Sequence, residues 1–305
     1  MVRDAFDCLV IGGGPAGLTA AIYLARFHLN VLVVDRGKGR ARSIPRTHNH
    51  AGFPNGITGD ELIDRMLEQA LEFGAAVRDG DVTELRTTEH FFSASVADEV
   101  ITARTVLLAT GVTNKRPDMP TALHDAAVAQ SLLRYCPVCD GYEVTDQRIG
   151  VIGSGQHGAQ EALFLRSFSR DVSLIAPNAA HDMAEGDRAA LALAGVALID
   201  GPVLHLTIQG KQMLVATATG ALSFDTVYPA LGSTIHGDLA RAVGAKVADS
   251  GCIKVDGHQR TSLARLYAAG DVVLGLDQIS HAMGDAGVAA TAIRNDLNAL
   301  TPLYR

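Results

Sequence analysis

The chain has few of the residues that characterise several common classes of protein. It contains four cysteines in 305 residues, and two of them, Cys8 and Cys252, are isolated in the sequence. The chain therefore lacks the cysteine framework of small secreted proteins, and a reducing compartment, by default the cytoplasm, is expected. The other two cysteines form the pair Cys136-Pro137-Val138-Cys139, which in such a compartment is expected to be catalytic.

Blocks of positive charge and long apolar segments are also absent. The net charge is −7, which argues against a nucleic-acid or anionic-membrane partner. The start of the chain carries Asp4 and Asp7, and the apolar run after them stops at Gly12, so neither a signal peptide nor a spanning helix is expected. What is present, 48% hydrophobic and 19% charged residues, is typical of a soluble protein with one large or two medium domains.

A glycine-rich turn lies in the first βαβ pattern of the chain. Gly12-Gly13-Gly14-Pro15-Ala16-Gly17 follows an apolar run over 6–11 and opens an Ala- and Leu-rich helix over 16–27. The glycines allow the backbone to approach a pyrophosphate at the N-terminus of that helix. Asp35 ends the next strand, 23 residues after Gly12, where a carboxylate accepts hydrogen bonds from an adenosine ribose. The pattern predicts a dinucleotide site.

The same pattern occurs a second time. A strand over 148–152 leads into Gly153-Ser154-Gly155-Gln156-His157-Gly158, a helix over 156–167 and a strand over 172–175. The chain thus contains a diverged repeat of two nucleotide-binding folds. The part after residue 232 has no glycine turn and is too short for an independent domain, so we expect it to return to the first. The predicted class is α/β, with two three-layer Rossmann-like domains, the second inserted into the first.

Further elements are predicted from hydrophobic periodicity. They are a helix over 60–73, an antiparallel meander over 82–101, a buried strand over 105–111, short strands over 203–208, 213–216 and 226–231, and a helix over 286–299.

Cys136 and Cys139 are spaced to close a small, reversible disulfide. Half of a zinc site is one alternative, but no second CxxC or closely spaced Cys/His pair supplies the other ligands, so no metal is expected. An inert buried pair is another. Because two nucleotide-type turns flank the pair, an enzyme that passes electrons between a cofactor and a dithiol is favoured.

Several segments resemble a known family. The first glycine turn, Leu107-Leu108-Ala109-Thr110-Gly111 and the segment from Leu266 to Asp271 resemble the flavin-binding signatures of disulfide reductases with two dinucleotide-binding domains. Cys-x-x-Cys-Asp-Gly before the second turn resembles the low-molecular-weight thioredoxin reductases, FAD-dependent members of the pyridine nucleotide-disulfide oxidoreductase family. The resemblance covers nearly the whole chain. It implies an FAD-binding domain over 1–113 and 232–305, and an NAD(P)-binding-like domain over 114–231 that carries the CxxC.

The resemblance also assigns flavin contacts. Gly270-Asp271 is implied to contact the FAD ribityl and pyrophosphate, and Asn49 to lie near the isoalloxazine ring. A backbone amide near Gln278 and Ile279 is implied to bind the N1/O2 region of the ring, helped by the dipole of the last helix. The expected FAD contacts are therefore Gly12, Gly14, Pro15, Ala16, Gly17, Asp35, Asn49, Thr110, Gly111, Gly270, Asp271, Gln278 and Ile279.

The two sulfurs are implied to have different roles, with Cys139 facing the flavin and Cys136 attacking the substrate disulfide. Asp140 is the candidate acid and base, because dithiol–disulfide exchange moves one proton for each thiolate formed or quenched. Burial beside the disulfide is expected to raise its pKa. His281, at the start of the last helix, is a further candidate base, although a histidine in that place is more often structural.

The second turn departs from the NADPH-using members of the family. Their next strand ends in His-Arg-Arg-x-x-x-Arg, whose arginines pair with the 2′-phosphate. Here the corresponding stretch runs from Ile175 to His181, and no arginine occurs between it and Arg188. Gly153, Gly155 and Gly158 therefore serve either a pyridine nucleotide or only the turn, and the use of NAD(P)H stays open. His181 is expected in a surface loop.

The leading hypothesis is a thioredoxin reductase-like enzyme that exchanges electrons between FAD, the Cys136–Cys139 pair and a substrate disulfide. The substrate is a thioredoxin-like protein or a small-molecule dithiol or disulfide. One alternative is a dithiol oxidase that forms disulfides in a small molecule and reduces O2; another is a reductase fed by ferredoxin or another flavin. A flavoprotein redox sensor is the non-enzymatic alternative, which no output domain supports. A homodimer is expected, because the relatives are homodimers.

Overall fold

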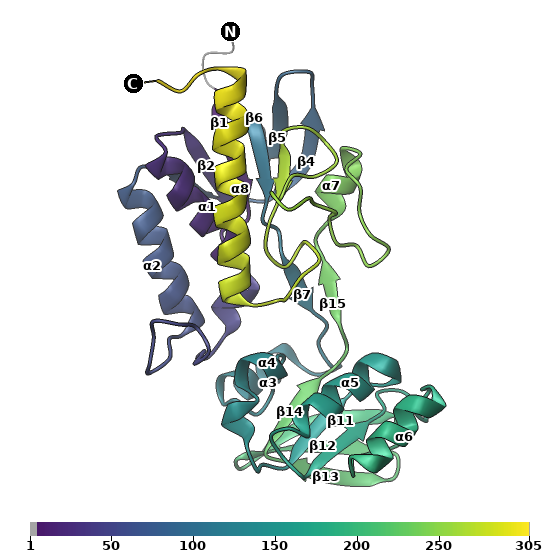
Figure 1. Cartoon of the computed structure of the whole chain (residues 1–305). Coiled ribbons are helices and arrows are strands. Elements are labelled where there is room, and N and C mark those ends of the chain that lie inside the picture. Colours follow the sequence, from purple (N-terminus) through teal and green to yellow (C-terminus); the bar gives the residue numbers. More distant parts are fainter. Residues whose placement is uncertain (1–4, 305) are drawn as a thin grey trace. The chain divides into compact units, whose positions relative to one another are not determined.

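The computed structural model describes residues 5–304, which divide into two compact units (Figure 1). Unit 1 comprises residues 5–46, 50–113 and 235–304, and unit 2 comprises residues 47–49 and 114–234. Most of unit 2 is therefore an insertion in the chain of unit 1. The predicted α/β class, with one dinucleotide-type fold inserted into another, is confirmed.

A seven-stranded sheet lies at the centre of unit 1, in the order β3-β2-β1-β6-β5-β4, with β16 paired to β6. The strands are β1 (Phe6–Ile11), β2 (Val31–Asp35), β3 (Ala76–Asp79), β4 (Val82–Thr87), β5 (Phe92–Val96), β6 (Glu99–Leu108) and β16 (Leu266–Ala268). The β4–β5 and β5–β6 pairs are antiparallel, and the other pairs are parallel. The sequence predicted two strands where β6 is one continuous strand, because its first half pairs with β5 and its second half with β1.

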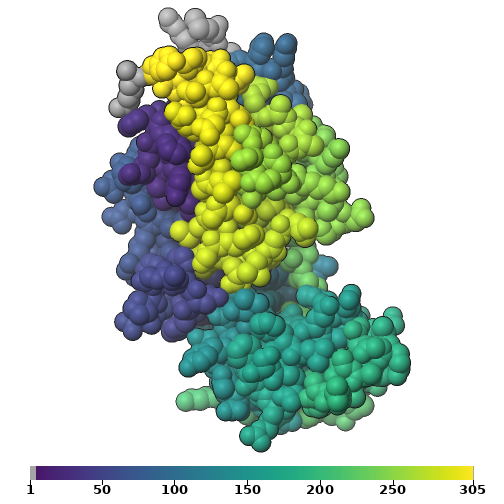
Figure 2. All heavy atoms as spheres, viewed as in Figure 1, coloured from purple at the N-terminus to yellow at the C-terminus, as the bar shows by residue number. Residues whose placement is uncertain are grey.

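Three helices cover one face of this sheet: α1 (Pro15–Arg26), α2 (Gly59–Glu72) and α8 (Ile279–Leu300). In β1, Cys8 and Val10 face these helices, whereas Leu9 and Ile11 belong to the core on the opposite face, together with side chains of β4, β5 and α7 (Asp238–Ala242). Burial on both faces explains why β1 is a continuous apolar run. Figure 2 shows α8, in yellow, along the surface of this unit.

The last helix begins earlier than residue 286, where hydrophobic periodicity places its start, and His281 lies in its first turn, as the resemblance implies. Gln278 is the N-cap of α8, and Ala282 and Ala286 are buried in the cluster that joins α8 to α1. Small residues at these positions allow α8 to pack closely against α1. This packing stabilises the first turns of α8, so the helix continues back to Ile279 although glycines interrupt its apolar pattern.

Unit 2 repeats the three-layer arrangement around a four-stranded parallel sheet in the order β10-β9-β8-β14. These strands are β8 (Ile149–Ile152), β9 (Val172–Ile175), β10 (Ala197–Ile199) and β14 (Thr226–Pro229). On one face pack α5 (Gly155–Leu165) and α6 (Glu185–Leu193). On the other pack α3 (Thr121–Ala129) and an antiparallel sheet of β11 (Val203–Gln209), β12 (Gln212–Thr217) and β13 (Gly220–Phe224).

The chain passes between the units through two short strands, β7 (Val112–Asn114) and β15 (Ser233–Ile235), which pair with each other. Over residues 5–304, no helix combines the length and apolar character needed to span a bilayer.

Candidate active site

The first glycine turn joins β1 to α1 at the carboxyl end of the parallel strands. Gly14 is the N-cap of α1 and Pro15 begins the helix, whose first turn contains no acidic residue. A Cβ on Gly17 would collide with the carbonyl oxygen of Gly12, whereas a Cβ on Gly14 would meet no atom within 4 Å. The turn is therefore tight on its inner side and open on its outer side, where the helix presents N–H groups to an anion.

A second loop of unit 1 reaches the same place. A Cβ on Gly270 would lie 2.9 Å from Ala16 Cβ and 3.4 Å from Ala282 Cβ, so this loop packs between the first turns of α1 and α8. Gln278 and Ile279 form the beginning of α8. The N-termini of two helices consequently converge beside Asp271.

The remaining predicted residues of unit 1 lie at the ends of neighbouring strands. Asp35 ends β2 beside the glycine turn, since a Cβ on Gly13 would lie 2.8 Å from its Cγ. Thr110 Oγ1 donates to the carbonyl of His236 (2.7 Å), and the carbonyl of Gly111 accepts from the His236 N–H (3.1 Å). These two contacts fasten the end of β6 to the segment before α7.

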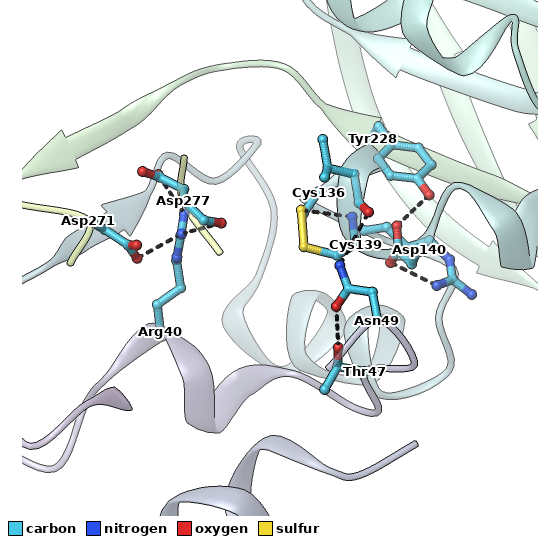
Figure 3. The surroundings of a disulfide bond; sticks show 11 residues. Arg40, Thr47, Asn49, Cys136, Cys139, Asp140, Tyr228, Asp271 and Asp277 are labelled. Atoms are coloured by element: carbon cyan, nitrogen blue, oxygen red, sulfur yellow. Dashed lines mark hydrogen bonds and ion pairs between the residues drawn. A yellow bond between two sulfur atoms is a disulfide. The ribbon is translucent and has the colours of Figure 1, made fainter. Parts of the chain in front are cut away.

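A cluster that the sequence did not predict adjoins this turn. Arg40 begins a 3-10 helix, η1 (Arg40–Ser43), and its Nη2 lies 2.8 Å from Asp271 Oδ2 (Figure 3). Its Nη1 lies 3.3 Å from Asp277 Oδ2. Burial raises the pKa of Asp271, and the charge of Arg40 opposes that shift. Arg40 thus compensates a buried carboxylate at the junction of the two helices.

These residues fit the FAD that the sequence predicts. The open side of the Gly14 turn and the N–H groups of α1 suit a pyrophosphate, and the Asp35 carboxylate suits ribose hydroxyls. Arg40 offsets the charge of Asp271, which would otherwise oppose a pyrophosphate at this end of the unit.

In unit 2, Cys136 and Cys139 form a disulfide with a Cα–Cα distance of 5.2 Å. Cys136 is the N-cap of a short helix, α4 (Pro137–Asp140), and its Sγ accepts a hydrogen bond from the Cys139 N–H (3.1 Å). Both cysteines are half-buried. Because an N–H donor stabilises a thiolate, this contact favours Cys136 as the nucleophile of the reduced pair.

The carboxylate of Asp140 is fixed by two donors (Figure 3). Arg134 Nη1 lies 2.8 Å from its Oδ2, and Tyr228 OH donates to its Oδ1 at 2.7 Å. Burial raises the pKa of Asp140, while the Arg134 charge and both hydrogen bonds act in the opposite direction. The predicted acid and base is therefore held in one orientation directly after Cys139.

Asn49 also lies in unit 2. Its Nδ2 is 3.4 Å from the carbonyl of Val138, inside the CxxC, and its Oδ1 accepts from Thr47 Oγ1 at 2.8 Å (Figure 3). The flavin contact assigned to Asn49 stays a prediction.

A second buried carboxylate, Glu161, lies on α5. Its side chain is 12% exposed, and its Oε1 has no hydrogen-bond partner within residues 5–304. Burial, followed by the charge of Asp140, raises the pKa of Glu161 to about 7. This residue therefore changes charge near neutral pH, under the influence of the Asp140 charge.

His281, the other predicted base, belongs to unit 1. Its ring packs against Gly275, its Nδ1 lies 3.8 Å from Asp285 Oδ2, and its side chain is 40% exposed. These contacts are those of a half-exposed structural histidine, and its catalytic role stays a prediction.

The second glycine turn joins β8 to α5. A Cβ on Gly158 would lie 2.9 Å from the carbonyl carbon of Gly153, so the turn requires this glycine whether or not a nucleotide binds. The surface position predicted for His181 is wrong, because the residue is 7% exposed and its Nε2 lies 3.1 Å from Leu174 O and 3.0 Å from Ile199 O. The imidazole bridges two neighbouring strands.

The isolated cysteines, Cys8 and Cys252, are buried and unpaired, and burial raises the pKa of Cys8 to about 12. Among the described residues, no group of three or more His, Cys, Asp or Glu side chains is arranged to hold a metal ion.

Sequence reasoning missed Arg40, Arg134, Glu161 and Tyr228. Each is a single polar residue that matches no motif, and Arg40, Arg134 and Tyr228 pair with carboxylates outside their own elements. Only the position of Arg134, two residues before Cys136, offered a signal.

Replacing Glu161 by Gln is expected to reduce the pH dependence of stability. The pKa is 4.5 for an ordinary Glu and about 7 in the folded chain, so the folded state retains a proton that the unfolded state loses. Raising the pH from 5 to 9 then lowers the free energy of unfolding by about 3 kcal/mol through this group. Urea unfolding at several pH values measures the effect. Glu185→Gln, at an exposed position of α6, is the control. An unchanged pH profile in Glu161→Gln would contradict the assignment.

Comparison with known proteins agrees with this geometry. Residues 6–286 match the family model described as pyridine nucleotide-disulphide oxidoreductase. A thioredoxin reductase of Mycolicibacterium smegmatis is 34% identical over 285 residues, covering 88% of each chain. One from Listeria monocytogenes is 30% identical over 304 residues, covering 93% of this chain and 91% of the relative.

A solved structure extends the similarity to the fold. The thioredoxin reductase of Streptococcus pyogenes superposes with a TM-score of 0.89 at 27% identity, covering 97% of this chain and 99% of that one. The chain therefore belongs to the pyridine nucleotide-disulphide oxidoreductase family, within which it is a thioredoxin reductase-like, FAD-dependent disulfide oxidoreductase.

Proposed function

We propose that Cys136 and Cys139 carry electrons between FAD held by unit 1 and the disulfide of a thioredoxin-like protein. The observation that carries this proposal is the half-buried Cys136–Cys139 disulfide, followed directly by a carboxylate that Arg134 and Tyr228 hold in place. A reversible disulfide needs an accessible sulfur and a nearby proton carrier, and this segment has both.

The exchange balances as a two-electron, two-proton step. Reduction breaks the Cys136–Cys139 bond and leaves the Cys136 thiolate and the Cys139 thiol, with the second proton on Asp140. The Cys136 thiolate attacks the substrate disulfide, forms a mixed disulfide and releases one substrate thiolate, which Asp140 protonates. Asp140 then takes the proton of the Cys139 thiol. The Cys139 thiolate attacks Cys136 Sγ, restores the internal disulfide and releases the second substrate thiolate, to which Asp140 passes that proton.

The residues of unit 1 serve to bind and orient FAD, which when bound supplies or accepts the electron pair. The Gly14 turn and the start of α1 bind the pyrophosphate, and Asp35 binds the ribose. Asp271 orients the ribityl region of FAD, and Arg40 offsets the charge of Asp271. Gln278 and Ile279 present the N-terminus of α8 to the flavin ring.

The oxidase alternative also has an observation in its favour. The segment 176–187 after β9 contains no Lys or Arg to bind the 2′-phosphate of NADPH. In an oxidase the substrate dithiol reduces the Cys136–Cys139 pair, and O2 accepts two electrons and two protons to give hydrogen peroxide.

A homodimer and a cytoplasmic location complete the proposal. Light scattering after gel filtration measures the oligomeric state.

Cys139→Ser is expected to abolish electron exchange between dithiols and the flavin. Without this sulfur the internal disulfide cannot form, so anaerobic bleaching of the flavin by dithiothreitol is expected to slow at least about 100-fold. Stopped-flow absorbance measures the rate, and Cys252→Ser, a buried cysteine of unit 1, is the matched control. Flavin bleaching at the wild-type rate in Cys139→Ser would refute the role of the Cys136–Cys139 pair. Peroxide formed with a dithiol in air would favour the oxidase.

Arg40→Gln is expected to weaken FAD binding about tenfold, because the buried Asp271 charge is then left uncompensated beside the bound pyrophosphate. The fluorescence of FAD released on dilution measures the dissociation constant. Arg42→Gln is the control, since Arg42 lies in the same short helix but pairs with Asp60 and Asp64. Equal FAD affinity in the two variants would contradict the assignment of Arg40.

A further inference from the structure

The two glycine turns of this chain differ in what lies in front of them. At the first turn, a Cβ on Gly14 would meet no atom within 4 Å. At the matching position of the second turn, a Cβ on Gly155 would lie 3.6 Å from the carbonyl oxygen of Asp182. The backbone of Asp182 therefore lies within van der Waals reach of the second turn, where the first turn has no such neighbour.

The segment 176–184 is held against this second turn. Ser154 Oγ donates to the Asp182 carbonyl (3.4 Å) and accepts from the Asp182 N–H (3.3 Å). The neighbouring His181 is anchored through its buried ring to β9 and β10 and through its N–H to Asp200 Oδ1 (3.2 Å). The close approach is therefore fixed by several contacts.

The charge of this segment is also unsuited to NADPH. Ala176 follows Gly153 at the spacing that separates Asp35 from Gly12, and it is buried and uncharged. The acidic residues Asp182, Glu185 and Asp187 lie in the segment or in the first turn of α6. The nearest cation in the sequence, Arg188, donates from Nη2 to the His181 carbonyl (3.2 Å).

A 2′-phosphate carries up to two negative charges and needs a cationic partner, which Arg supplies best. Around the second turn, the described residues provide an exposed carboxylate at Asp182 and one arginine, Arg188, which donates to the His181 carbonyl. A 2′-phosphate would therefore meet one arginine beside a carboxylate, in place of the three arginines of the motif in NADPH-using relatives.

We propose that the second nucleotide site discriminates against a 2′-phosphate, so that the nucleotide serving this enzyme, where one binds, lacks that group. The inference rests on the proposed function only in taking this turn as the place for an electron-donating nucleotide. Asp182 is the residue that sets the discrimination, and the Ser154 and His181 contacts hold it there.

Titration of the FAD-loaded protein with NAD⁺ and NADP⁺ by calorimetry tests the proposal, because neither oxidised nucleotide reacts with the oxidised enzyme. NADP⁺ is expected to bind no more tightly than NAD⁺, and absence of binding by both also agrees with the proposal. Tenfold tighter binding of NADP⁺ would overturn the proposal.

Charge reversal at Asp182 provides the second measurement. Asp182→Arg is expected to strengthen NADP⁺ binding relative to NAD⁺ about tenfold, or to make it detectable. Asp171→Arg makes the same charge change just before β9, at the end of that strand away from the glycine turn. It is expected to change neither the NAD⁺ affinity nor the NADP⁺ affinity. NADP⁺ binding that Asp182→Arg leaves unaltered would contradict the proposal. Flavin reduction by a dithiol uses no pyridine nucleotide, so it reports separately on the proposed function.

Discussion

The contact between Asp140 and its two donors is the interaction on which the chemistry of unit 2 depends. Arg134 and Tyr228 hold the carboxylate directly after Cys139, while burial raises its pKa. Burial alone would favour a neutral acid, and the arginine alone would favour a fixed anion. Together they give a carboxyl group that is oriented yet retains access to both protonation states, as a proton carrier for dithiol exchange requires.

The two units show how one fold serves two tasks. Both place a glycine turn between a parallel strand and a helix, and in both the turn is tight on its inner side. In unit 1 the outer side is open, and Arg40 offsets the Asp271 charge near it. In unit 2 the backbone of Asp182 approaches the outer side. The repeated turn preserves the fold, whereas the residues in front of it decide what binds.

Much of the fold could be predicted from the sequence, because buried parallel strands and glycine turns leave local patterns. β1 was predicted at its observed bounds, and the dithiol was found from its spacing. Hydrophobic periodicity missed the start of α8 because glycines interrupt its pattern, although buried alanines continue the helix. Arg134, Tyr228 and Arg40 were missed because their partners are brought to them by tertiary structure, and the burial of His181 follows from strand pairing that local sequence does not encode.

The central claim, that the Cys136–Cys139 disulfide exchanges electrons with bound FAD, is tested most directly by anaerobic reductive titration followed through the flavin absorbance. If the disulfide and the flavin share electrons, full reduction consumes about four electrons per chain, two for each centre, and Cys139→Ser consumes about two. A wild-type protein whose flavin is fully reduced by two electrons, with the disulfide still intact, would contradict the account.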